Sequence, residues 1–161
     1  MRRVVQLLKM FAKTHPSWNL PGGLLISALV AECYQPDATR DDHALFNTMS
    51  SVRLRLQRNR EVTNPVDSAY FLTDKQEHVN ELVRFEERLG QALEWLQPLC
   101  NYDCDEVTAY KVWEQVYDHI YWNRLVEGAE LRASEKSIHV LSSGMVLTGK
   151  STLPACLLYT S

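Results

Sequence analysis

Three short patterns in the sequence contain residue types that bind phosphates or metals. The first, GMVLTGKS at residues 144–151, matches the G-x-x-x-x-G-K-S pattern of a phosphate loop. In such a loop, backbone amides and the lysine surround the phosphates at the start of a helix. A predicted strand at 138–141 would precede it, but Pro154 leaves little room for the helix that must follow. A truncated phosphate-loop protein is therefore an alternative interpretation.

The second pattern is the D-x-D pair formed by Asp103 and Asp105. Two carboxylates on one face of a strand can share divalent metals for phosphoryl transfer. Here the pair follows Asn101 and Tyr102 and comes directly before a helical pattern. We therefore expect it to supply a helix N-cap rather than a metal site.

The third pattern joins Lys9 on a basic first helix to the glycines at the start of the next helix, Gly22 and Gly23. Helix N-terminal amides and a lysine can together bind a polyphosphate. A surface lysine and a loosely capped helix explain the same residues equally well, so the pattern alone leaves both interpretations open.

These candidate groups lie on or beside segments that read mostly as helix. Apolar residues at helical spacing predict helices over about 4–15, 21–35, 41–58, 73–97 and 105–117, with a shorter one at 123–133. Asp41 or Asp42 is the expected cap of the third helix, and Thr73 with Gln76 forms a capping-box pattern for the fourth. Two short strands are predicted at 138–141 and 145–147. The expected fold is mainly α: a bundle of about five helices with a short, β-containing tail.

Composition limits the class of protein. The 161 residues contain 17 Lys and Arg against 20 Asp and Glu, a formal net charge of -3, with 45% hydrophobic residues. These values are ordinary for a globular domain and give no strong nucleic-acid signal. No uncharged stretch is apolar and long enough to cross a bilayer, because the longest, 14–31, contains two prolines and two glycines. The sparse cysteines favour a reduced, cytoplasmic protein.

The last six residues, 156–161, read CLLYTS, which is the translation of a transposon end used in sequencing libraries, TGT CTC TTA TAC ACA TCT. We expect this segment to be adapter read-through and leave it out of the fold prediction. Without Cys156 three cysteines remain, and the C-x-x-x-C pair of Cys100 and Cys104 has no second ligand pair at zinc spacing.

An ordered series of short motifs runs through residues 2–122. It comprises LLKMF at 7–11, LPGGL at 20–24, LVAE at 29–32, RDD at 40–42, LF at 45–46, NPVD at 64–67, LT at 72–73 and WEQVY at 113–117. In order and spacing the series resembles the C-terminal helical half of bacterial cGAS-like nucleotidyltransferases, the CD-NTase enzymes of CBASS anti-phage defence. Those enzymes make cyclic di- or trinucleotide second messengers.

The resemblance implies that residues 1–122 are the helical lobe of a two-lobed enzyme, with a poorly defined tail at 123–155. The other lobe would carry the carboxylates that hold Mg²⁺ and activate a ribose hydroxyl. Lys9 matches the family lysine that reaches the triphosphate of the nucleoside triphosphate substrate. Gly22 stands where relatives often have a serine, which leaves the backbone amides of Gly22 and Gly23 for that contact.

No Gly-Ser turn with a strand-borne D-x-D precedes Lys9. We therefore expect Met1 to be internal to a longer protein, and this chain alone to lack both the metal ligands and catalytic activity. A stand-alone helical protein-interaction module is the alternative from another functional class, because amphipathic helices need only each other to form a core.

Overall fold

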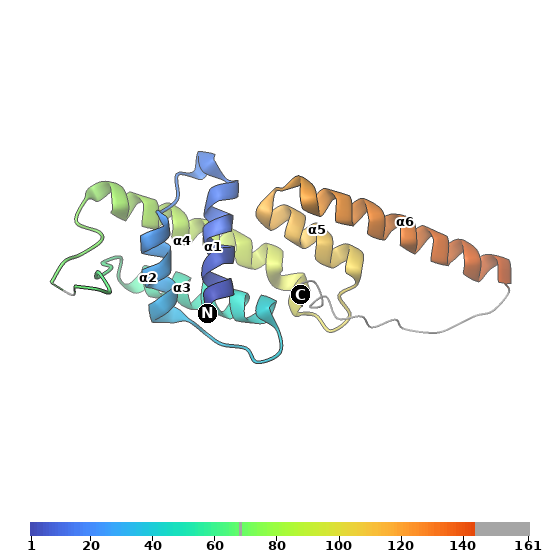
Figure 1. The fold of residues 1–161 in the computed structure, drawn as a ribbon, viewed down its shortest axis with the longest axis horizontal. Helices are drawn as coiled ribbons and strands as arrows, with labels where there is room; N and C mark the ends of the chain where they lie inside the picture. Colours follow the sequence, from blue (N-terminus) through green and yellow to red (C-terminus); the bar gives the residue numbers. More distant parts are fainter. Residues whose placement is uncertain (68, 144–161) are drawn as a thin grey trace. The chain divides into compact units, whose positions relative to one another are not determined.

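The computed structural model describes residues 1–67 and 69–143, with side chains up to residue 136. This part of the chain contains six α-helices, confirming the mainly α fold (Figure 1). They are α1 (Arg2–Thr14), α2 (Gly23–Cys33), α3 (Asp41–Arg58), α4 (Gln76–Leu96), α5 (Glu106–Tyr117) and α6 (Ile120–Ser143), with two short 3₁₀ helices, η1 (Pro16–Trp18) and η2 (Gln97–Cys100). The described residues form no strand, only an isolated antiparallel bridge between Thr63 and Phe71.

The chain divides into two compact units, Met1–Leu96 and Gln97–Ser161. In the first unit, α3 packs along α4, and α1 and α2 pack on each other and on α3. The helices pack because α1 and α4 each place apolar side chains on one face, whereas α2 is apolar around most of its circumference. The buried residues include Val4, Leu8 and Phe11 of α1, Ile26, Leu29 and Val30 of α2, Leu45, Met49, Val52 and Leu56 of α3, and Leu82, Phe85, Leu89 and Leu96 of α4.

A close contact between α3 and α4 depends on a glycine. A Cβ atom added to Gly90 of α4 would lie 2.8 Å from Cζ of Arg53 and 2.9 Å from its Nη2. The guanidinium of Arg53 thus lies against α4 at Gly90, which has no side chain. Its Nε donates to Oε1 of Glu86 at 3.2 Å. Gln57 donates to the same oxygen at 2.9 Å.

In the second unit, α5 packs against α6. Trp113 and Tyr117 of α5 and Trp122 of α6 are buried and stack with ring centroids 5.8 to 6.4 Å apart. At the surface, Lys111 pairs with Glu130 at 2.7 Å and Arg132 with Glu106 at 2.9 Å. These contacts hold the two helices of the unit together.

The prediction of a strand at 138–141 is wrong, because α6 continues to Ser143. The helix is also longer than the segment predicted at 123–133. No proline interrupts residues 120–143, and residues 129–136 are rich in good helix formers, so extension of an existing helix is favoured over a new strand. The second predicted strand, 145–147, lies outside the described residues.

Two predicted helix caps are also wrong. The N-cap of α3 is Arg40, with no side-chain cap hydrogen bond, and Asp41 and Asp42 lie in the first turn. The preceding turn is instead held by Asp37, whose Oδ1 accepts from the backbone N–H groups of Thr39 and Arg40. Thr73 accepts a hydrogen bond from the N–H of Val62, eleven residues earlier, rather than from the first turn of α4.

None of the helices among the described residues is long and apolar enough to cross a membrane. This finding agrees with the sequence, whose longest uncharged stretch, 14–31, contains two prolines and two glycines.

Candidate phosphate-binding site at the start of α2

The structure brings Lys9 and Gly23 together. A Cβ atom added to Gly23 would lie 3.2 Å from Cε of Lys9 and 3.6 Å from its Nζ. The end of the Lys9 side chain therefore lies over the first residue of α2, in space that any other residue at position 23 would partly fill. Both residues belong to the first unit, and α1 packs directly on α2.

The start of α2 has the electrostatic character of an anion site. Gly22 is the N-cap, no side chain caps the helix, and the first turn contains no acidic residue. The first N–H groups of a helix lack intrahelical acceptors and give this end a partial positive charge. The Lys9 ammonium adds a full positive charge beside it. No Asp or Glu occurs in residues 1–31 to balance the two.

The two glycines differ in what they provide. Gly22 has φ -65° and ψ 161°, values open to any residue, and a Cβ atom there would meet nothing within 4 Å. Its lack of a side chain leaves open space in front of the helix. Gly23, in contrast, makes room for Lys9. The structure thus places the side chain of Lys9 against Gly23. Gly22, the residue before Gly23, is the N-cap of α2.

The segment between α1 and α2 is anchored by aromatic contacts, and this anchoring positions the site. The rings of His15 and Trp18 stack with centroids 3.7 Å apart, and Phe11 meets Trp18 edge-on at 5.6 Å. From α4, the guanidinium of Arg88 lies 4.4 Å from the Trp18 ring centroid, and Nε of Arg84 donates to the carbonyl of Asn19 at 3.1 Å. These contacts hold the chain just before Gly22. Sequence reasoning missed them.

The D-x-D pair acts as predicted for a cap. Asp105 is the N-cap of α5, and its Oδ1 accepts from the N–H of Thr108 at 2.7 Å. This hydrogen bond is the main reason why the pKa of the Asp105 carboxyl is lowered. No three His, Cys, Asp or Glu side chains form a metal-binding group in residues 1–67 and 69–136. The phosphate-loop match at 144–151 lies outside the described part of the chain.

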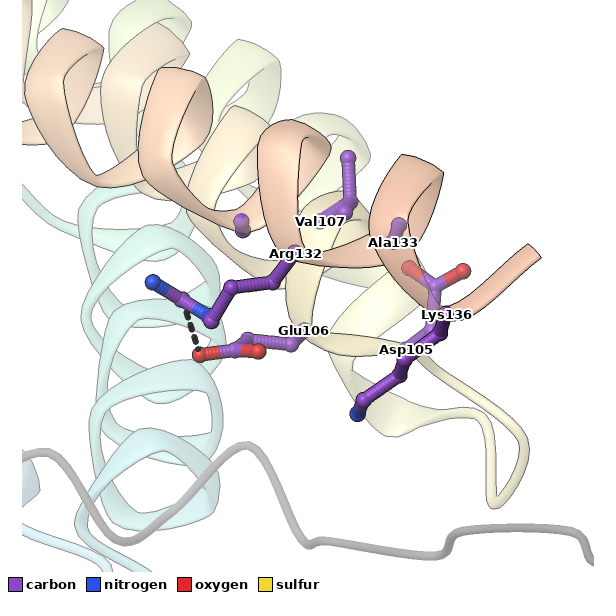
Figure 2. Close-up of a pocket in the computed structure, with 7 residues that line it drawn as sticks. Asp105, Glu106, Val107, Arg132, Ala133 and Lys136 are labelled. Carbon is purple, nitrogen blue, oxygen red and sulfur yellow. Dashed lines mark hydrogen bonds and ion pairs between the residues drawn. The ribbon is translucent and has the colours of Figure 1, made fainter. Parts of the chain in front are cut away.

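Sequence reasoning also missed a pocket of about 170 Å³ between the start of α5 and α6 (Figure 2). Its lining includes Asp105, Glu106, Arg132 and Lys136 over an apolar floor of Val107, Ala129 and Ala133. Glu106 already accepts hydrogen bonds from Arg132 and from the hydroxyl of Tyr110, at 2.9 and 3.0 Å, and Asp105 caps α5. Three of the four charged groups therefore already have structural partners.

Comparison with known proteins adds no family assignment: no protein-family model matches the chain, and no curated protein matches it. The candidate site therefore depends on the residues and their geometry, together with the motif order described above.

Proposed function

We propose that this chain contributes the helical lobe of a nucleotidyltransferase that makes cyclic di- or trinucleotide second messengers in anti-phage defence. In this role Lys9 and the amides of Gly22 and Gly23 bind the triphosphate of a nucleoside triphosphate. The observation that carries the proposal is the contact between Lys9 and Gly23 at an uncapped helix start. Two positive groups are held together there without a nearby acid in the sequence, an arrangement suited to a polyanion.

The metal chemistry of such an enzyme would come from outside the described residues. Two Mg²⁺ ions held by carboxylates would orient the attacking hydroxyl and the leaving pyrophosphate. Since residues 1–67 and 69–136 contain no group of ligands for them, we assign Mg²⁺ no ligand here. The role proposed for this chain is to bind and orient the triphosphate, which lowers the entropic cost of bringing the reactants together.

Binding can be tested by titrating the ¹⁵N-labelled chain with ATP at low ionic strength and following amide resonances by NMR. We expect the resonances of Gly22, Gly23 and Leu24 to shift, and Lys9→Ala to weaken the affinity by at least about tenfold, because a hydrogen bond to a charged group contributes about 1.5–3 kcal/mol. Lys75→Ala is the matched control, since it removes an exposed lysine from another part of the unit. Equal affinity of the Lys9→Ala variant and the wild type would refute the proposed role of Lys9.

A second test concerns activity. Incubated with Mg²⁺ and nucleoside triphosphates, this chain alone should yield no cyclic or linear oligonucleotide, because the proposed catalytic carboxylates belong to the other lobe. Product formation by this chain would show that the proposed division between the lobes is wrong.

One observation favours the alternative of a helical protein-interaction module. Between α3 and α4, backbone hydrogen bonds join Asn64 to Tyr70 and Leu72 to Val62, and the side chains of Val66, Tyr70 and Phe71 are exposed by 92%, 67% and 51%. Exposed apolar side chains grouped on one loop are typical of protein-binding surfaces. If ATP shifts no resonance of the wild-type chain, this alternative becomes the better account.

A further inference from the structure

The pocket between α5 and α6 combines opposite charges with an apolar floor (Figure 2). Its charged lining consists of two acidic and two basic side chains, Asp105, Glu106, Arg132 and Lys136. All of its lining residues belong to the second unit, whereas Lys9 and the start of α2 belong to the first. The pocket is therefore a candidate binding site that is independent of the proposed nucleotide site.

Three of the charged side chains have polar groups that are not engaged in the described part of the chain. Glu106 accepts from Arg132 and from Tyr110 through the same oxygen, Oε1, so its Oε2 accepts no hydrogen bond there. Arg132 makes this contact through Nη2 and leaves Nη1 without an acceptor. No ion pair between residues 1–67 and 69–136 involves Lys136. A ligand can thus bind these groups without displacing a protein partner.

The balance of charges favours a ligand that carries both signs. A simple anion bound at Lys136 would also lie near the carboxylates of Asp105 and Glu106, which repel it. A simple cation bound at Glu106 would lie near Arg132 and Lys136. A zwitterion can place its ammonium beside a carboxylate of the pocket and its own carboxylate beside a cation, so that both contacts are attractive.

The size and the floor of the pocket limit the ligand further. The volume of about 170 Å³ is well below the roughly 300–1,000 Å³ of pockets for drug-sized molecules. It equals the volume of about five or six water molecules in the liquid. The floor of Val107, Ala129 and Ala133 is aliphatic. These properties suit a small molecule with a short aliphatic group.

We propose that this pocket binds a free α-amino acid with a small aliphatic side chain. The ammonium of the ligand donates to Oε2 of Glu106, and its carboxylate accepts from Lys136 and from Nη1 of Arg132. Its side chain lies on the floor, where burial of apolar surface adds to the affinity. The ion pair of Arg132 with Glu106 stays intact, and so does the cap that Asp105 provides for α5.

Titration of the ¹⁵N-labelled chain with L-valine at constant ionic strength, followed by NMR, tests this proposal. We expect saturable shifts of the amide resonances of Val107, Ala129 and Ala133. Isovalerate is valine without the ammonium, and isobutylamine is valine without the carboxylate. Each should bind at least about fivefold more weakly than L-valine, as expected for the loss of one exposed ion pair.

Two variants and a control test the residues. Lys136→Gln should weaken L-valine binding about fivefold, because it removes one exposed ion pair. Lys75→Gln, which changes an exposed lysine of the first unit, should leave the affinity unchanged. Ala133→Phe places a ring over the pocket at an exposed position and should abolish the saturable shifts of Val107 and Ala129, while far-UV circular dichroism shows that the helices are retained.

Several results would overturn the proposal. If L-valine causes no saturable shift at its highest soluble concentration, the pocket is not an amino-acid site. If isovalerate or isobutylamine binds as tightly as L-valine, the pocket recognises a single charge and not a zwitterion. Equal affinity of Lys136→Gln and the wild type would show that Lys136 does not hold the carboxylate. None of these results bears on the proposed nucleotide site, which lies in the first unit.

Discussion

Replacing Gly90 by alanine tests the most closely packed contact between α3 and α4. Alanine in a helix interior is favoured over glycine by about 1 kcal/mol. At this position, however, the new methyl carbon would lie 2.8 Å from Cζ of Arg53. The guanidinium must therefore move, because carbon atoms do not approach this closely without a bond.

The cost of that movement can be estimated from the partners of Arg53. Its side chain is 40% exposed and can swing into solvent, so the main loss is its hydrogen-bonded ion pair with Glu86. A partly exposed pair of this kind contributes about 0.2–1 kcal/mol. Glu86, only 14% exposed, keeps its hydrogen bond from Gln57. The gain and the loss nearly cancel, and we expect Gly90→Ala to change the free energy of unfolding by less than about 0.5 kcal/mol.

Replacing Arg53 by alanine should reveal the preference for alanine over glycine at position 90 of α4. In an Arg53→Ala background the obstacle is gone, and Gly90→Ala should stabilise the protein by about 1 kcal/mol. Urea denaturation of the wild type, both single variants and the double variant, followed by far-UV circular dichroism, gives the coupling energy of the two positions. If Gly90→Ala stabilises both backgrounds equally, Arg53 does not lie across Gly90 in solution, and the packing argument is refuted.

Two further predictions concern helix starts. Gly22→Ser should raise the free energy of unfolding by a few tenths of a kcal/mol, because serine can cap α2 at a position where a side chain meets nothing within 4 Å. The control Gly22→Ala lacks the capping oxygen and should show no such gain. Equal free energies of unfolding for the two variants would count against the cap. Asp105→Ala should cost about 1 kcal/mol at neutral pH. Because the folded-state pKa of Asp105 is lowered, its stabilisation is present above the usual carboxyl pKa and is lost as the pH falls below about 4. Asp105→Asn keeps a cap without a titrating group, so its stability relative to the wild type should improve over the same pH range, as denaturation at several pH values would show.

The helices were predictable because their core residues recur at helical spacing. Val4, Leu8 and Phe11, or Leu82, Phe85 and Leu89, each form an apolar face that only a helix buries as a unit. Their starts were less predictable, because several polar side chains near each start compete for the same amides. Asp37 rather than Asp41 orders the turn before α3, and Thr73 accepts from Val62 across a loop. The Thr73 contact spans eleven residues and has no local sequence pattern, whereas the Asp37 turn spans three residues and is a local alternative to a cap at Asp41.

The candidate site also combines features that local sequence predicts with features that depend on contacts between distant residues. Local sequence indicates a basic helix and a glycine-bearing helix start, but not that Lys9 meets Gly23, since this contact requires α1 and α2 to pack on each other. The motif order supplied that expectation through the resemblance. The anchoring of Trp18 by Arg88 had no sequence signal, because an aromatic residue and a cation seventy residues apart form no local pattern.

The charges around Lys9 also predict how stability and binding should diverge. A lysine held near the positive end of a helix is repelled by it, by about 0.3–1 kcal/mol. The fold tolerates this because the burial of each core side chain, such as Leu8 or Leu29, stabilises it by about 1.5–3 kcal/mol. In the absence of nucleotide, Lys9→Ala should therefore leave the free energy of unfolding unchanged or slightly increased, while it weakens ATP binding. If the substitution instead destabilises the ligand-free protein by more than about 1 kcal/mol, Lys9 serves the packing of α1 on α2 rather than a ligand.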